Sequence, residues 1–367
     1  MIDQASILKT PLVEEHKSLG AKLATFGGWL MPIQYTGIID EHLWTRKHAG
    51  LFDICHMGEF IIEADPANSD FERLVTMNLK GMSVSSCRYG FMLNEEGGIV
   101  DDLLIYRISD TRWMAVVNAA TTGGDELHMR KYLTGVTRLE NVSASLGKLD
   151  LQGPETEKTL IELAGAGVKK LRYYTFGYFT VLGERIIISR TGYTGELGYE
   201  LYMPNQKIVL LWRKLLEDKR VRPIGLGARD TLRLEMGYSL YGQDIDIKTS
   251  PLEAAGEHFI CWDKEFIGKP ALLKQRQGGL PKRIIYFIAD SRRAPRHNYR
   301  IAHKLQDIGA VTSGSFSPSL GFGIGMGYVS REVAIGEEIV LKEGKVSISA
   351  KVVNKPFYKN GSAKIIN

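Results

Sequence analysis

Residues 89–106 hold the side chains in this chain that are best suited to proton transfer. Two apolar stretches flank a Gly-Gly turn, and Asp101 and Asp102 follow that turn directly. Adjacent residues of a strand point to opposite faces, so only one of the two carboxylates can share a face with Tyr89 or with a pocket floor. That aspartate is a candidate acid or base, and the other is expected to be solvated or to cap the turn. A hairpin with ordinary turn carboxylates is the alternative.

A second segment, residues 191–200, combines three glycines with two carboxylates and two tyrosines. Glycines allow a backbone to approach a ligand closely. A carboxylate in this segment could accept the paired donors of an aminopyrimidine edge, such as that of a pterin ring. A glycine-rich connection between strands, carrying surface acids, is the alternative.

A third segment, residues 225–235, places Arg229 and Arg233 four residues apart. On a helix these two side chains share a face. They could clamp a carboxylate of a ligand, or they could pair with Asp230 and Glu235, which is the usual outcome for surface residues.

Other familiar motifs are absent from the sequence. The glycines of residues 321–325 have the wrong spacing for a dinucleotide fingerprint, and no Walker A, G-x-S-x-G or HExxH motif occurs. The three cysteines, Cys55, Cys87 and Cys261, lie far apart and lack metal-ligand spacing, so no metal site is predicted and reduced thiols are expected.

Composition and charge indicate a globular protein of more than one domain. The 367 residues are 44% hydrophobic and 24% charged, and the net charge is +5 without any block of like charges. Binding to nucleic acid is not indicated. Neither a leader segment nor an apolar run of roughly 18 to 20 residues is recognised, so no membrane association and a cytoplasmic location are expected.

The elements that would position these residues can be outlined from periodicity. A helix is predicted over residues 10–19, whereas residues 26–32, with two glycines and a proline, are expected to form no regular element. Strands around one helix are predicted between residues 53 and 118, namely residues 60–62, 89–93, 103–108 and 113–117. This pattern is typical of an α+β unit.

A second α+β unit is predicted further along the chain. Strands at residues 185–190 and 199–203 precede an amphipathic helix over residues 208–215. The polar residues 272–282, with Gly-Gly and Pro, are interpreted as a linker. After residue 283 the short β-rich runs at residues 284–288, 338–341 and 346–353 predict a small barrel or sandwich.

A series of short motifs carries a family resemblance that covers essentially the whole chain. They occur in this order: FGGW at residues 26–29, GLFD at 50–53, HMGE at 56–59, MLN at 92–94, GGIVDD at 97–102, GYTGELGYE at 192–200, GLGARDTLRLE at 225–235 and TSGSFSP at 312–318. Together they resemble the successive motifs of glycine cleavage system T proteins, the aminomethyltransferases.

The resemblance implies an α+β fold of three lobes, in which two α+β lobes surround a folate cavity and a β-barrel forms the third. It implies a folate-binding region over residues 1–275, with two interleaved lobes, one of them at approximately 53–140, and a barrel domain over residues 283–367. The activity implied is transfer of a methylene carbon from the aminomethyl-lipoyl arm of H protein to tetrahydrofolate, with release of ammonia. Tetrahydrofolate would be a co-substrate, and neither a metal nor pyridoxal phosphate would be required.

By position in the motifs, Asp101 matches the family's catalytic aspartate, Glu200 the glutamate that binds the pterin, and Arg229 a folate-binding arginine. Four further residues are candidates for the folate pocket: Tyr89, Asn118, Tyr238 and Met57. The lipoylated H protein is the implied partner, and an arginine-rich stretch could meet it if exposed, formed by Arg292, Arg293 and Arg296.

Two departures from the family pattern stand out. Cys55 occupies a position where many members have serine, and Glu257-His258 lies in a stretch that is usually apolar. Two alternative functions remain open at this point: a tetrahydrofolate-dependent demethylase of a small methylated compound, and a non-enzymatic folate-binding protein of iron–sulfur maintenance. The second lacks support because its Lys-Gly-Cys motif does not occur in this chain.

Overall fold

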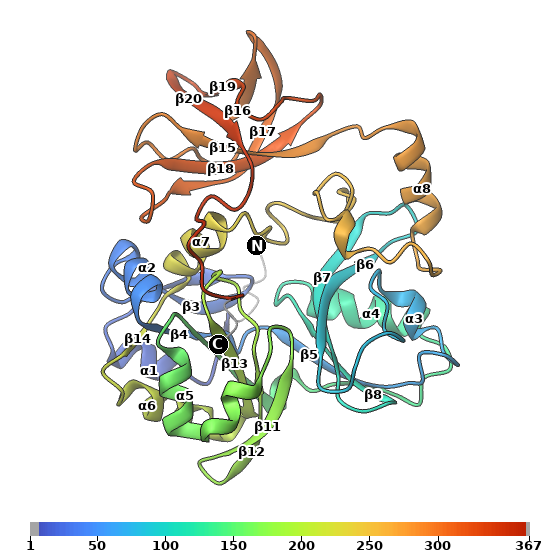
Figure 1. Ribbon diagram of the computed structural model, residues 1–367, viewed down its shortest axis with the longest axis vertical. Coiled ribbons are helices and arrows are strands. Elements are labelled where there is room, and N and C mark those ends of the chain that lie inside the picture. The colour runs from blue at the N-terminus through green and yellow to red at the C-terminus, as the bar shows by residue number, and fades with distance from the viewer. Residues whose placement is uncertain (1–6, 365–367) are drawn as a thin grey trace, which may run out of the picture.

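The computed structural model describes residues 7–364, which form two large sheets with helices, a small three-stranded sheet and a barrel (Figure 1). The barrel lies at one end of the molecule, and the two larger sheets lie next to each other below it. This arrangement confirms the predicted α+β class with a C-terminal barrel. We propose the domain division given above, because the two large sheets and the barrel are each built around a core of their own.

The six-stranded sheet has the order β11-β12-β13-β10-β4-β14. Its helix α6 buries Ile208, Leu211, Trp212 and Leu215, as the periodicity predicts. The elements of this part are α1 (Val13–Ser18), α2 (Ile38–Lys47), β4 (Ala49–Asp53), η1 (Ser143–Ser145), β10 (Leu146–Gln152), α5 (Thr156–Ala164), η2 (Ala166–Lys170), β11 (Phe176–Val181), β12 (Glu184–Ser189), β13 (Gly198–Pro204), η3 (Asn205–Lys207), α6 (Ile208–Leu216), β14 (Val221–Pro223) and α7 (Leu226–Glu235).

The five-stranded sheet has the order β6-β7-β8-β5-β9 and packs against α3 and α4. All four strands predicted between residues 53 and 118 are present. The elements are β5 (Gly58–Glu63), α3 (Phe71–Leu74), β6 (Cys87–Leu93), β7 (Ile99–Arg107), β8 (Arg112–Val117), α4 (Thr122–Tyr132) and β9 (Arg138–Asn141).

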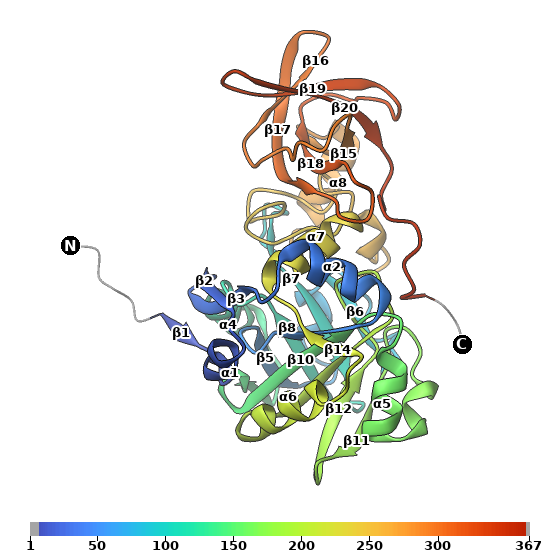
Figure 2. The same cartoon turned by 90° about the vertical axis from the view of Figure 1, so that its left-hand side faces the viewer.

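The C-terminal strands close into a six-stranded barrel rather than a sandwich, in the order β15-β18-β17-β16-β19-β20. Its strands are β15 (Arg283–Ala289), β16 (Arg300–His303), β17 (Gln306–Phe316), β18 (Gly323–Val329), β19 (Glu338–Glu343) and β20 (Val346–Val353). Figure 2 shows α7 directly beneath this barrel. Glu235 at the end of α7 accepts hydrogen bonds from Ser317 and Ser319 of the barrel, which fixes the barrel on the six-stranded sheet.

The expectation that residues 26–32 form no regular element is wrong. They form the turn of a hairpin between β2 (Lys22–Phe26) and β3 (Trp29–Gln34), and β1 (Leu8–Lys9) pairs with β3 on its other side. Gly27 and Gly28 both have positive φ, at 55° and 85°, so they supply a tight turn. Pro32 is tolerated because β1 pairs only with Trp29 and Leu30, so the missing N–H leaves no ladder bond unmade there.

The interpretation of residues 272–282 as a linker is also wrong over most of its length. Helix α8 runs from Lys269 to Gly278, with a proline in its first turn and Gly279 at a φ of 87° after its end. Leu272 is buried, so one apolar side chain anchors a helix that is otherwise polar. The short helix η4 (Glu257–Phe259) precedes it. The helix predicted over residues 10–19 is shorter than expected, because α1 begins at Val13 rather than at residue 10.

Among residues 7–364, no helix combines the length and the apolar character needed to cross a bilayer.

Candidate active site

Asp101 lies in the middle of β7 and is fully buried. The backbone N–H of Asn118 donates to Asp101 Oδ2 at 2.9 Å, and the Asn118 side-chain amide donates to Asp101 Oδ1 at 2.8 Å. Asn118 directly follows β8, the neighbour of β7 in the sheet. The carboxylate is therefore held from both sides by one residue of the adjacent strand.

Asp102 is not solvated, contrary to the expectation for the second aspartate. The Tyr89 hydroxyl donates to Asp102 Oδ2 at 2.9 Å, and the Asn118 amide donates to Asp102 Oδ1 at 2.9 Å. Tyr89 thus shares a hydrogen bond with Asp102 and not with Asp101. Asn118 directly follows β8, so its side chain is not confined to one face of the sheet. It therefore reaches the carboxylates of both Asp101 and Asp102.

Burial raises the pKa of both aspartates. The pKa of Asp101 lies well above its ordinary value, first because of burial and then because of the neighbouring charge of Asp125 on α4. For Asp102, burial and the charge of Asp101 raise the pKa to about 7. The main influences on the two groups within residues 7–364 include no arginine or lysine. This part of the site therefore favours protonated carboxyl groups.

Glu200 lies on β13 and is buried beside a cation on the adjacent strand β10. The Lys148 ammonium stands 3.5 Å from Glu200 Oε2, and the Tyr202 hydroxyl donates to the same oxygen at 2.8 Å. Lys148 Nζ also lies 3.4 Å from Met57 Sδ. Two of the residues predicted for the folate pocket, Glu200 and Met57, are thereby brought together around Lys148.

Arg229 of α7 reaches the same sheet. Its Nη1 donates to Asp150 Oδ2 on β10 at 2.7 Å, and its guanidinium lies 5.0 Å from the Tyr193 ring centre. Burial raises the pKa of Asp150 to about 6 in spite of the opposing effect of Arg229. Arg233 does not join this site, since it is buried and donates to Asp244 and Ser313, and it also pairs with Asp230 as the alternative for this segment predicted.

The glycines of residues 192–198 serve the protein core rather than a close ligand approach. A Cβ atom at Gly192 or Gly198 would lie 2.1 or 2.0 Å from the side chain of Gln152, which itself accepts a hydrogen bond from Thr194. A Cβ atom at Gly195 would collide with Met236. Glu200 follows this turn, and its position depends on that packing.

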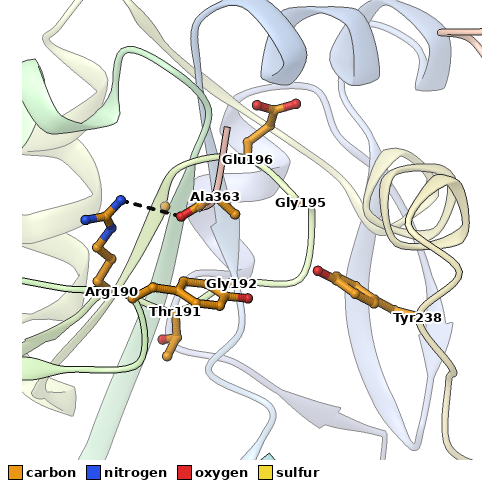
Figure 3. Close-up of a pocket in the computed structure, with 9 residues that line it drawn as sticks. Arg190, Thr191, Gly192, Gly195, Glu196, Tyr238 and Ala363 are labelled. Carbon is orange, nitrogen blue, oxygen red and sulfur yellow. Dashed lines mark hydrogen bonds between the residues drawn. The ribbon is translucent and has the colours of Figure 1, made fainter. Parts of the chain in front are cut away.

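Tyr238 faces a small pocket between the loop after α7 and the turn that begins at Thr191 (Figure 3). Its ring stacks on Tyr193, with centroids 5.7 Å apart. On the far side of this pocket Arg190 donates to the Ala363 carbonyl oxygen, so the C-terminal segment closes it. Tyr238 is near Arg229 through Tyr193, but it does not lie among the carboxylates of β7.

The two halves of the site meet through a pair of tyrosines. Tyr106 on β7 and Tyr202 on β13 have hydroxyl groups 2.9 Å apart, and Tyr202 in turn donates to Glu200. An apolar cluster that includes both tyrosines and Phe176 joins the five-stranded and six-stranded sheets. The strand of Asp101 and the strand of Glu200 are therefore in direct contact.

Sequence reasoning missed three charged residues of the site: Lys148, Asp150 and Asp125. Lys148 and Asp150 are two residues apart on β10, so they share a face, and the alternation of polar and apolar residues in 146–152 was the available signal. Asp125 lies in the first turn of α4 and carries no distinguishing pattern.

The two departures from the family pattern are accommodated differently. Cys55 is buried, its thiol donates to the Lys148 carbonyl at 3.3 Å, and burial raises its pKa well above the ordinary value. His258 stacks on Phe259 with centroids 3.9 Å apart, and Phe259 packs edge-on against Tyr89 at 4.6 Å. Cys55 thus supports the strand of Lys148, whereas His258 lies one aromatic ring away from Tyr89.

A cavity of about 610 Å³ opens beside α4, next to the start of β7. Asp125 and Val100 line it, together with Tyr241, whose hydroxyl donates to the Ile99 carbonyl at 3.2 Å. Within the described part of the chain, no group of three or more His, Cys, Asp or Glu side chains has an arrangement that could hold a metal ion.

Known proteins are similar to this chain in sequence and in fold. Residues 12–264 match the family described as GCVT N-terminal domain, and residues 282–359 match the glycine cleavage T-protein C-terminal barrel domain. An aminomethyltransferase of Halothermothrix orenii is 45% identical over 95% of this chain and 99% of its own length, and one of Listeria monocytogenes is 41% identical over 96% and 98%.

The crystal structure of glycine cleavage system aminomethyltransferase T from Bartonella henselae superposes with a TM-score of 0.90. It is 34% identical in sequence, and the alignment covers 97% of this chain and 99% of that one. Matches of this extent, in both domains and over the full fold, show that the chain belongs to the glycine cleavage T-protein family.

Proposed function

We propose that this chain is an aminomethyltransferase that passes the methylene carbon of an aminomethyl-lipoyl H protein to tetrahydrofolate and releases ammonia. The observation that carries the proposal is the buried carboxyl of Asp101, which is fixed by Asn118 on a strand in contact with that of Glu200. The relatives' names supply the reaction class, and the site supplies groups suited to it.

The Glu200 side of the cavity suits the pterin of tetrahydrofolate. Only Oε2 of Glu200 receives hydrogen bonds within residues 7–364, so Oε1 is free to accept from an aminopyrimidine edge. Two buried polar atoms nearby, His56 Nδ1 and Glu59 Oε1, likewise find no partner among those residues. Buried polar atoms are seldom left unpaired, which supports a polar ligand at this place. Arg229 and Met57 would border the same ligand.

The Asp101 side suits the proton movements of the transfer. Its carboxyl accepts two hydrogen bonds from Asn118 that keep it in one orientation, and burial keeps bulk water away. Bound tetrahydrofolate supplies the two amine nitrogens between which the carbon is carried. Asp101 would hold one of these N–H groups and take up its proton. In its ionised form it would also stabilise positive charge that develops on the transferred carbon.

The lipoylated partner is proposed to meet a basic surface. Arg292, Arg293 and Arg296 are exposed on the loop between β15 and β16, and the Arg292 guanidinium lies 4.9 Å from the Phe316 ring centre. An acidic carrier protein would be attracted by such a loop. The three cysteines are free thiols, which fits a reducing compartment, and we propose a cytoplasmic location on that ground.

The test is ammonia release from aminomethyl-lipoyl H protein, with and without tetrahydrofolate, for the wild-type chain, Asp101→Asn and Asp110→Asn. Asp110 is an exposed aspartate at the end of the same hairpin region, and its variant serves as the matched control. We expect release that depends on folate, is lost in Asp101→Asn and is retained in Asp110→Asn. Folate binding without release by the wild-type chain, or demethylation of a small compound without any lipoyl protein, would contradict the proposal.

A further inference from the structure

A third buried carboxylate lies beside Asp101, and it has no hydrogen-bond donor of its own. Asp125 of α4 is fully buried, and neither of its oxygens has a donor in good hydrogen-bonding geometry within residues 7–364, although the Thr121 hydroxyl lies close enough to lower its pKa. The neighbouring Thr121 hydroxyl donates instead to the Asn118 carbonyl at 3.0 Å. An ionised carboxylate in such a place would bear the full cost of desolvation.

The backbone after β8 explains why the two carboxyl groups meet. The Thr121 N–H donates to the Asn118 carbonyl at 3.3 Å, and the Asp125 N–H donates to the Thr121 carbonyl at 2.8 Å. These two turns fold the start of α4 back over β7. Asp101 and Asp125 come within hydrogen-bonding reach of each other, while Asn118 holds Asp101 from the other side.

The charged and titratable groups around this contact do not neutralise it. Asp102 of β7 adds a further carboxylate. On α4, burial lowers the pKa of His128, and Lys131 donates to Tyr132 at 2.7 Å on the exposed side. From the loop above, the Tyr241 hydroxyl is occupied by the Ile99 carbonyl, and its pKa is raised by burial and by the surrounding aspartates.

Two carboxyl groups in contact in a buried site cannot both be ionised, so one of them keeps a proton. We propose that Asp125 is a positioning residue of the transfer reaction, which shares one proton with Asp101 across the contact between α4 and β7. This proposal rests on the proposed function for its reaction, although the shared proton itself would exist without any substrate.

The proton balance of the transfer reaction explains how two carboxyl groups that share one proton could serve it. The reaction breaks the C–N bond to the departing amine and the C–S bond to the lipoyl group, and it forms two C–N bonds to the folate. Two folate N–H protons are lost, one proton is gained by the amine as it becomes ammonia, and one is gained by the sulfur as it becomes a thiol. A pair that holds one proton can give it to a leaving group and accept the next one from the folate, so it ends the cycle with one proton again.

The cavity on the α4 side supports this assignment, because Asp125 lines it and interacts directly with Asp101. A residue that only supported packing would have no need of an unpaired carboxylate facing a cavity of about 610 Å³. Through this cavity the pair can equilibrate its proton with solvent between turnovers.

The first test compares the pH dependence of kcat/KM for ammonia release in the wild type, Asp125→Asn, Asp125→Glu and Glu126→Gln. Glu126 is the adjacent acid on α4, paired with Arg130 on the surface, so its variant makes the same charge change outside the pair. Removal of the Asp125 charge lowers the pKa of Asp101, so the limb of the profile that belongs to Asp101 should move to lower pH by about one unit or more. Asp125→Glu should restore the wild-type limb. A limb that stays in place in Asp125→Asn would overturn the proposal, even if the rate falls.

The second test needs neither turnover nor a substituted Asp125. Infrared spectroscopy of the wild-type chain carrying isotopically labelled aspartate should show the carbonyl stretch of a protonated carboxyl group at neutral pH. Because the pKa values of Asp102 and Asp125 are also raised to about 7, the variants are compared at pH 9, where the band should disappear in Asp101→Asn and persist in Asp102→Asn. Absence of the band from the wild type would overturn the shared proton while leaving the proposed transferase activity untouched, and loss of ammonia release with the band intact would do the reverse.

Discussion

Asp101 of β7 and Asp125 of α4 are buried as fully as Asp150 of β10 and Glu200 of β13, and Asp102 is half-buried, but the two groups of carboxylates differ in their partners. Asp101, Asp102 and Asp125 have only neutral donors and one another as neighbours, whereas Glu200 lies beside Lys148 and Asp150 lies beside Arg229. The pKa of Asp102 is raised to about 7 and that of Asp150 to about 6, because Arg229 offsets part of the burial effect on Asp150.

This difference separates two kinds of chemistry in two adjoining regions. Carboxyl groups without cations exchange protons near neutral pH, which suits acid and base steps. Carboxylates beside buried cations are oriented by charge-assisted contacts, which suits recognition of a polar ring. We therefore expect substitutions on β7 to change turnover and substitutions on β10 or β13 to change stability and folate affinity.

The largest effect is expected from Asp101→Asn. An amide at this position keeps the shape of the carboxyl group and can accept only one of the two hydrogen bonds that Asn118 donates, and it cannot take up a proton. Turnover should fall by about 10²–10⁴-fold, the usual contribution of a positioned acid or base. Single-turnover ammonia release at saturating folate measures this loss. A decrease of less than about tenfold would place the proton transfer elsewhere.

A comparable effect, but on stability, is expected from Lys148→Met. Lys148 is only 1% exposed, and its removal leaves Glu200 buried without a counter-charge. Breaking a buried pair from one side typically costs about 3–5 kcal/mol. Urea denaturation measures the change in the free energy of unfolding, with Lys169→Met, an exposed lysine, as the control. Equal stabilities for the two variants would mean that the ammonium group of Lys148 does not offset the buried charge of Glu200.

The two regions differ in how far their residues could be predicted from the sequence, and the reason is physical. The strand that holds Asp101 was predicted only over residues 103–108, and β7 begins at Ile99, because the turn residues before it hide the start of the apolar pattern. Lys148 and Asp150 escaped notice because β10 is buried on both faces, where charged residues are not expected. The position of Asp125 beside Asp101 depends on two successive turns after β8, and no local sequence pattern indicates such a contact.

The same contrast explains the errors in the fold. The hairpin of β2 and β3 was missed because Gly27 and Gly28 were taken as breakers, although two residues with positive φ are what a tight hairpin turn requires. Helix α8 was missed because it is polar along most of its length and depends on one buried leucine, Leu272. The roles of Asp101, Glu200 and Arg229 came from the family resemblance, and they stay predictions until their variants are measured.

A smaller effect is expected in the pH dependence of stability. The folded pKa of Asp102 is about 7 and its ordinary value is 3.8, so between these values the folded chain binds more protons than the unfolded chain. Stability should therefore fall as the pH rises from about 4 to about 7, and Asp102→Asn should flatten this decline. Urea midpoints measured across that range test the sign. A wild-type chain that gains stability over the same range more steeply than Asp102→Asn would contradict the assignment.

The smallest effect is expected from Tyr89→Phe. This change removes one hydrogen bond to Asp102 and leaves the ring packed against Phe259. The expected loss is about 0.5–1.5 kcal/mol of stability, with folate affinity little altered. Tyr132→Phe removes an exposed hydroxyl that donates to Glu95 and serves as the control. A large loss of folate affinity in Tyr89→Phe would move this residue into the recognition half of the site.

The most direct test of the division between the two regions is calorimetric titration of tetrahydrofolate into Asp101→Asn and Glu200→Gln. The account predicts that Asp101→Asn binds the folate with nearly wild-type affinity while failing to release ammonia. It predicts that Glu200→Gln loses about 1.5–3 kcal/mol of binding free energy, the worth of hydrogen bonds to a charged group. Equal losses of affinity in both variants would contradict the claim that one region holds the folate and the other moves the protons.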